Sequence, residues 1–269
     1  MGALASCGGG EGKVHEGLVD RTPTETAPSK PADEVRGERL GGEAMGLLRD
    51  TESVRIGVEM NSPEGHQEVS LHMDRRSNCT GTFDAGPMQQ GELVMVGGGD
   101  VYIRYSDTSL DAIRDAAAAR GPGVAATARE RTDLVRGKYL KMPKASGSSG
   151  AASPAKMCDL DKVLGQLGSG SGASGSGLSG ARALPERRWH GQQVTPLAAT
   201  DGGHDMTAYL AVGDKPFIVG MTQTRGDERM EMRMSDYYKP VAAHAPDPSL
   251  VLDPEALGMD VGGGSLFEV

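Results

Sequence analysis

Residues 53–61 read SVRIGVEMN, and every second residue from Val54 to Met60 is apolar. This two-residue period is typical of a β-strand with one apolar face and one face in water. The sequence SPEG at residues 62–65 predicts a turn, after which the same period returns in residues 69–73. The stretch therefore predicts two neighbouring antiparallel strands, and the apolar face that they share must be covered by another part of the chain.

Three similar runs extend this pattern to Tyr105. They are residues 79–83, 93–96 and 101–105, and the glycines of residues 97–99 permit a tight turn between the last two. A second group of strand-like runs follows later, at residues 192–197, 205–212, 217–224 and 229–235. The sequence therefore predicts two groups of antiparallel strands.

Helical features precede the first strand and fill the segment between the two strand groups. The expected helices are residues 40–48, 107–120, 124–136 and 157–167. Ser106 or Asp107 can cap the second helix, and the last one repeats apolar residues at helical spacing from Leu160 to Leu167. Because the strands do not alternate with helices, we predict an α+β fold: a strongly curved antiparallel β half-barrel with helices covering its concave face.

Composition divides the chain into three parts. Residues 1–34 are expected to hold a truncated leader and a disordered tether, and residues 253–269 a disordered tail. Residues 35–252 are expected to form a single domain with a flexible Gly/Ser loop at residues 168–181. The 40 glycines of the chain gather largely in such linkers, because ordering glycine costs the most backbone entropy.

The sequence LASC at residues 4–7 resembles the bacterial lipobox, in which the cysteine receives a lipid after a signal peptide is removed. A signal peptide carries a positive segment and roughly 7 to 15 apolar residues before its cleavage site. Only the six residues 1–6 precede Cys7. We therefore expect a coding start upstream of Met1 and a lipid anchor on Cys7, and a free thiol in a cytoplasmic tail is the alternative.

Charge and motif content argue against several classes of function. A net charge of −9 and a pI near 5.2 argue against nucleic acid as a partner. No apolar run reaches the roughly 18 to 20 residues that cross a bilayer. The six histidines are scattered, and the sequence has neither a Cys-x-x-Cys pair nor a nucleophile elbow. A hydrolase would need a cluster of catalytic residues, which the sequence lacks. We therefore expect no catalytic residues, and we also expect a monomer without a metal or cofactor.

Two cysteines remain once Cys7 is assigned to the lipid. Cys79 opens a predicted strand, and Cys158 begins the helix expected to cover that sheet. In an exported protein a Cys79–Cys158 disulfide would join helix to sheet, with a stabilisation on the order of 4 to 5 kcal/mol in the chain-entropy model. The alternative is a pair of buried thiols that never meet.

Five short motifs carry a family resemblance. They are NCTGT at residues 78–82, GKYL at 137–140, CDL at 158–160, SDY at 235–237 and KPV at 239–241. With them the chain resembles actinobacterial lipoproteins of the Streptomyces type, whose fold is similar to LolA and to the mycobacterial lipid carriers LppX and LprG. The resemblance covers about residues 35–252. It implies a half-barrel around an apolar cavity for acyl chains, with Cys7 as the anchored cysteine and Cys79 and Cys158 as a recurrent pair.

These features favour an extracytoplasmic lipoprotein, anchored to the cell membrane through acylated Cys7, that binds or carries a lipid or other apolar ligand without catalysis. The alternative is a cell-envelope interaction or sensor module of the same fold that transports no ligand. Two leucines and six methionines at apolar strand positions are the candidate cavity lining: Met60, Leu71, Met73, Met206, Leu210, Met230, Met232 and Met234. Met is flexible enough to contact irregular acyl chains, although the same residues can simply fill gaps in a core with few aromatic side chains.

Overall fold

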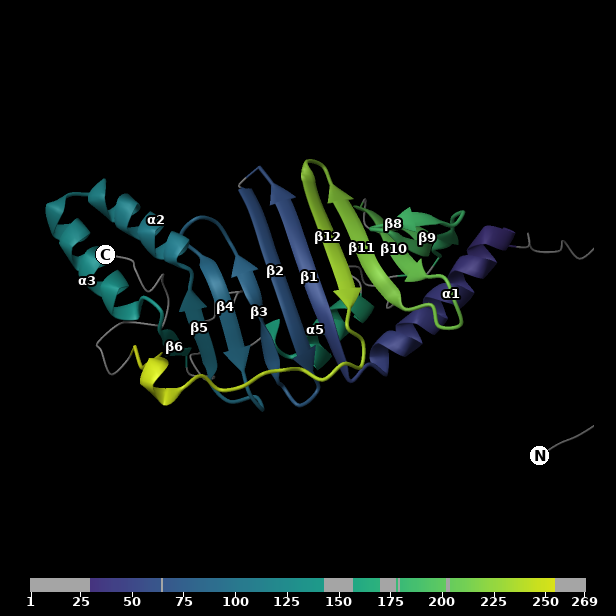
Figure 1. The fold of residues 1–269 in the computed structure, drawn as a ribbon. Helices are drawn as coiled ribbons and strands as arrows, with labels where there is room; N and C mark the ends of the chain where they lie inside the picture. The colour runs from purple at the N-terminus through teal and green to yellow at the C-terminus, as the bar shows by residue number, and fades with distance from the viewer. Residues whose placement is uncertain are drawn as a thin grey trace, which may run out of the picture. The chain divides into compact units, whose positions relative to one another are not determined.

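The fold is a curved, mostly antiparallel sheet with helices on its concave face, as predicted. The computed structural model describes residues 30–63, 65–142, 157–169, 178, 180–201 and 204–254. Residues 1–29 of the expected leader and tether, which include Cys7, most of the expected Gly/Ser loop at residues 168–181 and residues 255–269 of the expected tail lie outside these ranges. Residues 32–34, expected to belong to the tether, are helical instead. In the described ranges thirteen strands form one sheet (Figure 1).

The first strand group contains β1 (Ser53–Ser62), β2 (Gly65–Asp74), β3 (Cys79–Asp84), β4 (Gln90–Met95), β5 (Val101–Tyr105) and β6 (Tyr139–Met142). The second contains β7 (Arg182–Ala183), β8 (Arg187–Trp189), β9 (Gln192–Asp201), β10 (His204–Ala211), β11 (Ile218–Arg225) and β12 (Glu228–Ser235), and the short β13 (Val251–Leu252) lies at the outer edge of the first group. Each group is mainly a meander, in which most neighbouring strands are also consecutive in sequence.

Strands β1 and β12 join the two groups in the middle of the sheet. They pair antiparallel, with Ile56 opposite Met234 and Val58 opposite Met232. On its other side β1 pairs with β2, where Ile56 lies opposite Leu71. The apolar positions of neighbouring strands therefore fall in common rows on one face of the sheet, which is the face that curves inward.

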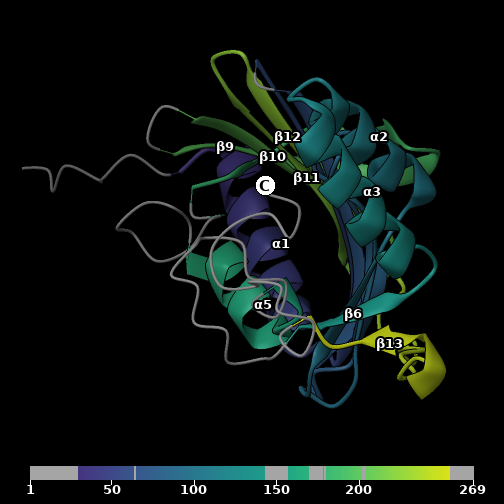
Figure 2. The same cartoon turned by 90° about the vertical axis from the view of Figure 1, so that its left-hand side faces the viewer.

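Helices α1 (Ala32–Arg49) and α5 (Leu160–Ser169) cover this concave face (Figure 2). Their buried side chains join the main core together with residues of β1 to β5 and β9 to β12. Helix α1 begins earlier than the expected residue 40, because its buried stripe starts with Gly37 and Gly41. A search for apolar periodicity does not count glycines, so the first half of this helix was missed.

Helices α2 (Asp107–Ala118) and α3 (Pro122–Val135) enclose a second, smaller core near β6. Leu110, Ile113 and Val135 of these helices pack with Leu140 of β6. The side chain of Ser106 accepts a hydrogen bond from the Ser109 amide at 3.1 Å, which is the predicted cap of α2.

After β12 the chain turns back across the sheet. Asp236 and Tyr238 have positive φ angles of 53° and 60°, and the Tyr238 amide donates to the carbonyl of Ser53. The segment continues to a short 3-10 helix, η1 (Pro248–Leu250), and to β13, which pairs in parallel with β6. Among the described residues, no helix combines the length and apolarity needed to span a bilayer.

Candidate functional site: the concave face

Burial of the side chains on the concave face decreases toward one end of the central strands. In β1, Val54 and Ile56 are only 0% and 4% exposed, Val58 is half-buried, and Met60 is 40% exposed. These four residues occupy every second position of the strand, so their side chains all lie on the same face. The concave face is therefore closed at the start of β1 and open toward the hairpin that joins β1 to β2.

Neighbouring strands repeat this gradient in register. In β12, Met234 and Met232 are buried while Met230 is half-buried. In β10, Ala208 and Leu210 are buried while Met206 is half-buried. Seven partly accessible side chains therefore form what we call the open apolar patch: Val58, Met60, Val69, Phe83, Met206, Met221 and Met230.

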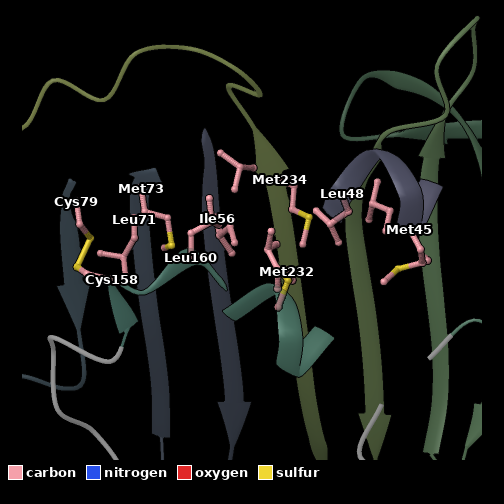
Figure 3. Close-up of a cluster of buried hydrophobic side chains, with 14 of the residues drawn as sticks. Met45, Leu48, Ile56, Leu71, Met73, Cys79, Cys158, Leu160, Met232 and Met234 are labelled. Carbon is pink, nitrogen blue, oxygen red and sulfur yellow. A yellow bond between two sulfur atoms is a disulfide. The ribbon is translucent and has the colours of Figure 1, made fainter. Parts of the chain in front are cut away.

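The closed half of the concave face is packed against the two covering helices. Figure 3 shows Ile56, Leu71, Met73, Met232 and Met234 of the sheet on the same side as the side chains of α1 and α5. All five are buried, with at most 7% of each exposed. The closed half is thus a conventional apolar core, and it holds the sheet and helices together.

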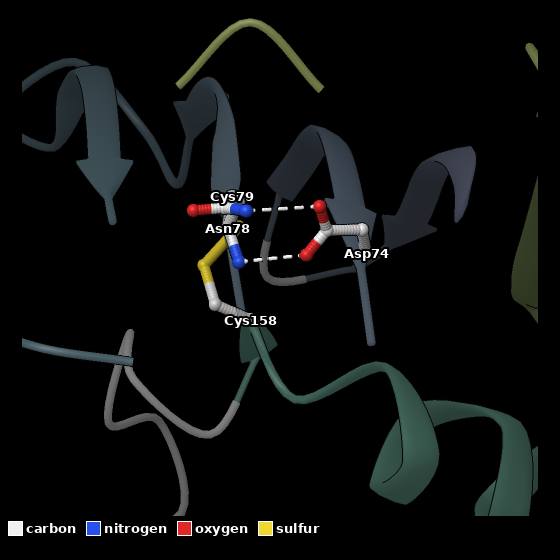
Figure 4. Close-up of a disulfide and its surroundings, with 4 residues drawn as sticks. All are labelled: Asp74, Asn78, Cys79 and Cys158. Atoms are coloured by element: carbon white, nitrogen blue, oxygen red, sulfur yellow. Dashed lines mark hydrogen bonds between the residues drawn. A yellow bond between two sulfur atoms is a disulfide. The ribbon is translucent and has the colours of Figure 1, made fainter. Parts of the chain in front are cut away.

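A disulfide fixes the start of α5 to this core. Cys79 at the first position of β3 is bonded to Cys158, with 5.6 Å between their Cα atoms (Figure 4). Both cysteines are fully buried. The structure thus contains the Cys79–Cys158 pair that the sequence suggested.

Polar contacts shape the turn that leads to Cys79. Asp74 accepts hydrogen bonds at 2.9 Å from the amides of Arg76 and Asn78, and a third from the Asn78 side chain (Figure 4). Arg75 in the same turn donates to the carbonyl of Thr51 at 2.9 Å and contacts Asp161 of α5. The end of α1, the β2–β3 turn and the start of α5 are therefore linked to one another.

The predicted lining residues divide between the two halves. Leu71, Met73, Leu210, Met232 and Met234 lie in the closed core. The remaining three, Met60, Met206 and Met230, lie in the open apolar patch. A ligand-binding role for any of them stays a prediction. Phe83 was not singled out from the sequence, although its position opposite Val69 in the β2–β3 pairing follows from strand periodicity.

An aromatic pair borders the patch at Phe83. The second ring is that of Tyr105, whose pKa is raised by burial above its ordinary value. Its ring meets that of Phe83 edge to face, with 6.1 Å between centroids. Within the described ranges, no group of three His, Cys, Asp or Glu side chains is arranged to hold a metal ion.

Comparison with solved structures identifies the fold. LprF from Mycobacterium bovis superposes with a TM-score of 0.51, covering 79% of this chain and 97% of LprF at 11% sequence identity. The chain has the LprF fold. The lipoprotein LppX from Mycobacterium tuberculosis and a LolA superfamily protein from Nitrosomonas europaea also match, at lower TM-scores of 0.45 and 0.28. LppX covers 77% of this chain at 12% identity, and the LolA superfamily protein covers 80% at 8%.

Sequence comparison alone does not detect a relative of this chain. No protein-family model matches the chain, and no curated protein matches it. At 11% identity the likeness to LprF establishes the fold, while the ligand has to be argued from the residues themselves.

Proposed function

We propose that this protein binds the acyl chain of a lipid on the concave face of its sheet and performs no covalent chemistry. The open apolar patch carries the proposal. It places accessible apolar side chains on the inner face of the sheet, where they continue the packed core outward. An acyl chain lying on the patch would remove apolar surface from water, which stabilises the complex by about 25 cal/mol per Å² buried.

The closed half of the concave face supports such a site because helix α5 is attached to the sheet there. The Cys79–Cys158 disulfide and the contact of Arg75 with Asp161 hold the first turn of α5 against the sheet. Val163 and Leu167, farther along α5, are only partly buried against the same core. The helix therefore has further partly accessible apolar side chains beyond its fixed end.

Export and anchoring complete the proposal. A disulfide persists in oxidising compartments, so the Cys79–Cys158 bond favours a location outside the cytoplasm. The LASC sequence at residues 4–7 provides the acylation site, with Cys7 as the lipidated residue. LppX, which shares a weak structural likeness, is described as a lipoprotein. The protein would thus present its concave face on the outer side of the cell membrane.

Titration with the fluorescent fatty acid cis-parinaric acid tests this proposal. We expect saturable binding by the wild-type protein, and Met60→Glu should weaken it at least about tenfold because a carboxylate would be buried against the acyl chain. Leu134→Glu is the matched control, since Leu134 of α3 is 45% exposed and Met60 is 40% exposed. Equal binding by both variants, or none by the wild type, would contradict the proposal.

A further inference from the structure

Five methionines occupy neighbouring positions toward the open end of the concave face. They come from four consecutive strands of the sheet, β1, β12, β11 and β10. We call Met60, Met206, Met221, Met230 and Met232 the methionine cluster. Four of the five belong to the open apolar patch, and the fifth, Met232, is 7% exposed.

Strand register places these side chains together. Met60 lies directly opposite Met230 in the β1–β12 pairing, and Met221 lies directly opposite Met232 in the β11–β12 pairing. Opposite residues on one face have Cβ atoms about 4.5 to 5.5 Å apart. Met230 and Met232 are two positions apart in β12, so the two pairs are adjacent along the same strand. Met206 follows on β10, where it shares Gln223 of β11 as a cross-strand neighbour with Met230.

Methionine is not among the residue types that are most enriched in strands. Strands favour β-branched and aromatic residues, which pack well on a pleated surface. Val58 and Val69, in the same patch, show that β-branched residues are accommodated here. Apolar packing alone would be served as well by Leu, since Leu and Met exchange in protein interiors at small energetic cost. The property that Met adds is a soft, polarizable thioether.

We propose that the methionine cluster binds one Cu(I) ion. Thioethers are soft ligands and select Cu(I), whereas Mg²⁺ and Ca²⁺ require oxygen ligands. The flexible side chains of the two opposed pairs can bring three or more sulfur atoms to one ion. Thioethers carry no proton that must be lost on binding, so affinity would not depend on deprotonating a ligand in the way that a Cys site does.

Competition against the Cu(I) chelator bicinchoninate, under anaerobic conditions with ascorbate, tests this site. The full chain carries Cys7→Ser in every sample, so that the remaining thiol cannot bind the metal, and ascorbate leaves the disulfide intact. We expect one Cu(I) per chain. Met60→Leu combined with Met230→Leu should raise the dissociation constant at least about tenfold, because half of the opposed thioethers are lost while the apolar volume stays.

The matched control removes two methionines from the closed core. Met73 and Met95 are 1% and 2% exposed, and Met73→Leu with Met95→Leu should leave Cu(I) affinity unchanged. Failure of the Cys7→Ser protein to compete for Cu(I), or equal affinity in both double variants, would overturn the proposal. In the Cys7→Ser protein, saturable binding of cis-parinaric acid without competition for Cu(I) would overturn the metal site alone, and the reverse result would contradict the acyl-chain site alone.

Discussion

Gly37 of α1 lies so close to Ala181 that a Cβ atom on the glycine would sit 2.0 Å from the carbonyl oxygen of Ala181. One turn later, a Cβ on Gly41 would lie 3.2 Å from the side chain of Leu178. The two glycines allow α1 to lie directly on the segment that enters β7. The glycine content of α1 is therefore a packing requirement at these positions, although glycine weakens a helix on its own.

Substitution of Gly37 should be costly. Because the obstructing atom is part of the backbone, Gly37→Ala has to move the helix, and we expect it to lower the free energy of unfolding by roughly 1 to 3 kcal/mol. Gly42→Ala is the control, since nothing lies within 4 Å of a Cβ there. It should raise the free energy of unfolding by roughly 0.5 to 1 kcal/mol. Urea denaturation followed by circular dichroism measures both, and equal effects would mean that α1 does not pack as described.

Removal of the disulfide should loosen the attachment of α5. The bond joins residues separated by 79 positions, and a loop of that length corresponds to about 4 to 5 kcal/mol in the chain-entropy model. We expect Cys79→Ala with Cys158→Ala to lower the free energy of unfolding by up to this amount. Dithiothreitol should shift the urea midpoint of the wild type in the same direction and leave the double variant unchanged. A wild-type midpoint that ignores the reductant would contradict this expectation.

His72 should make stability depend on pH. This side chain of β2 is 5% exposed. Burial and, as a smaller effect, the nearby charge of Arg55 lower its pKa below 6.5, although the charges of Asp236 and Asp74 and a hydrogen bond with the Lys239 backbone act in the opposite direction. As the pH falls below about 6.5, the unfolded chain binds a proton that folded His72 resists, so the free energy of unfolding decreases.

The variants His72→Gln and His66→Gln isolate this contribution. Urea denaturation at pH 7.5 and 5.5 should show a smaller loss of stability on acidification for His72→Gln than for the wild type. The side chain of His66 in the same strand is 48% exposed, so His66→Gln should behave as the wild type does. An unchanged pH dependence in His72→Gln would rule out this role for His72.

The fluorescence of Trp189 should detect a change in packing on the opposite face of the sheet. Its ring stacks on Tyr209 with 4.4 Å between centroids, and a Cβ on Gly220 would lie 2.1 Å from the indole. We expect Gly220→Ala to displace the ring and red-shift the emission of this single tryptophan. At Gly57, which lies on the same face, the nearest atom to an added Cβ is 3.9 Å away. Gly57→Ala should leave the spectrum unchanged, and an identical response of the two variants would exclude the contact.

Strand periodicity predicted most of the sheet. The alternation around Ile56 and Met232 gave the position and inward face of β1 and β12, and the absence of alternating helices gave the fold class. Strands β7, β8 and β13 were missed because each has only two or three residues, too few for a period to be visible. Their positions depend on pairing with distant parts of the chain, which a local pattern does not encode.

The candidate site was harder to predict than the fold. Alternation places Met60 and Met234 on one face but contains no information on which end of the strand the helices cover. That distinction comes from the attachment of α5 through Cys158 and from the early start of α1 at Ala32. The division into a closed core and an open patch therefore required the three-dimensional structure.

NMR of the protein labelled with ¹³C at its methionine methyl groups tests the acyl-chain site most directly. On titration with palmitate, we predict saturable shifts for Met60, Met206, Met221 and Met230, with smaller changes at the buried Met95. Shifts confined to Met88, in the β3–β4 turn, or no shifts at all, would contradict binding on the concave face.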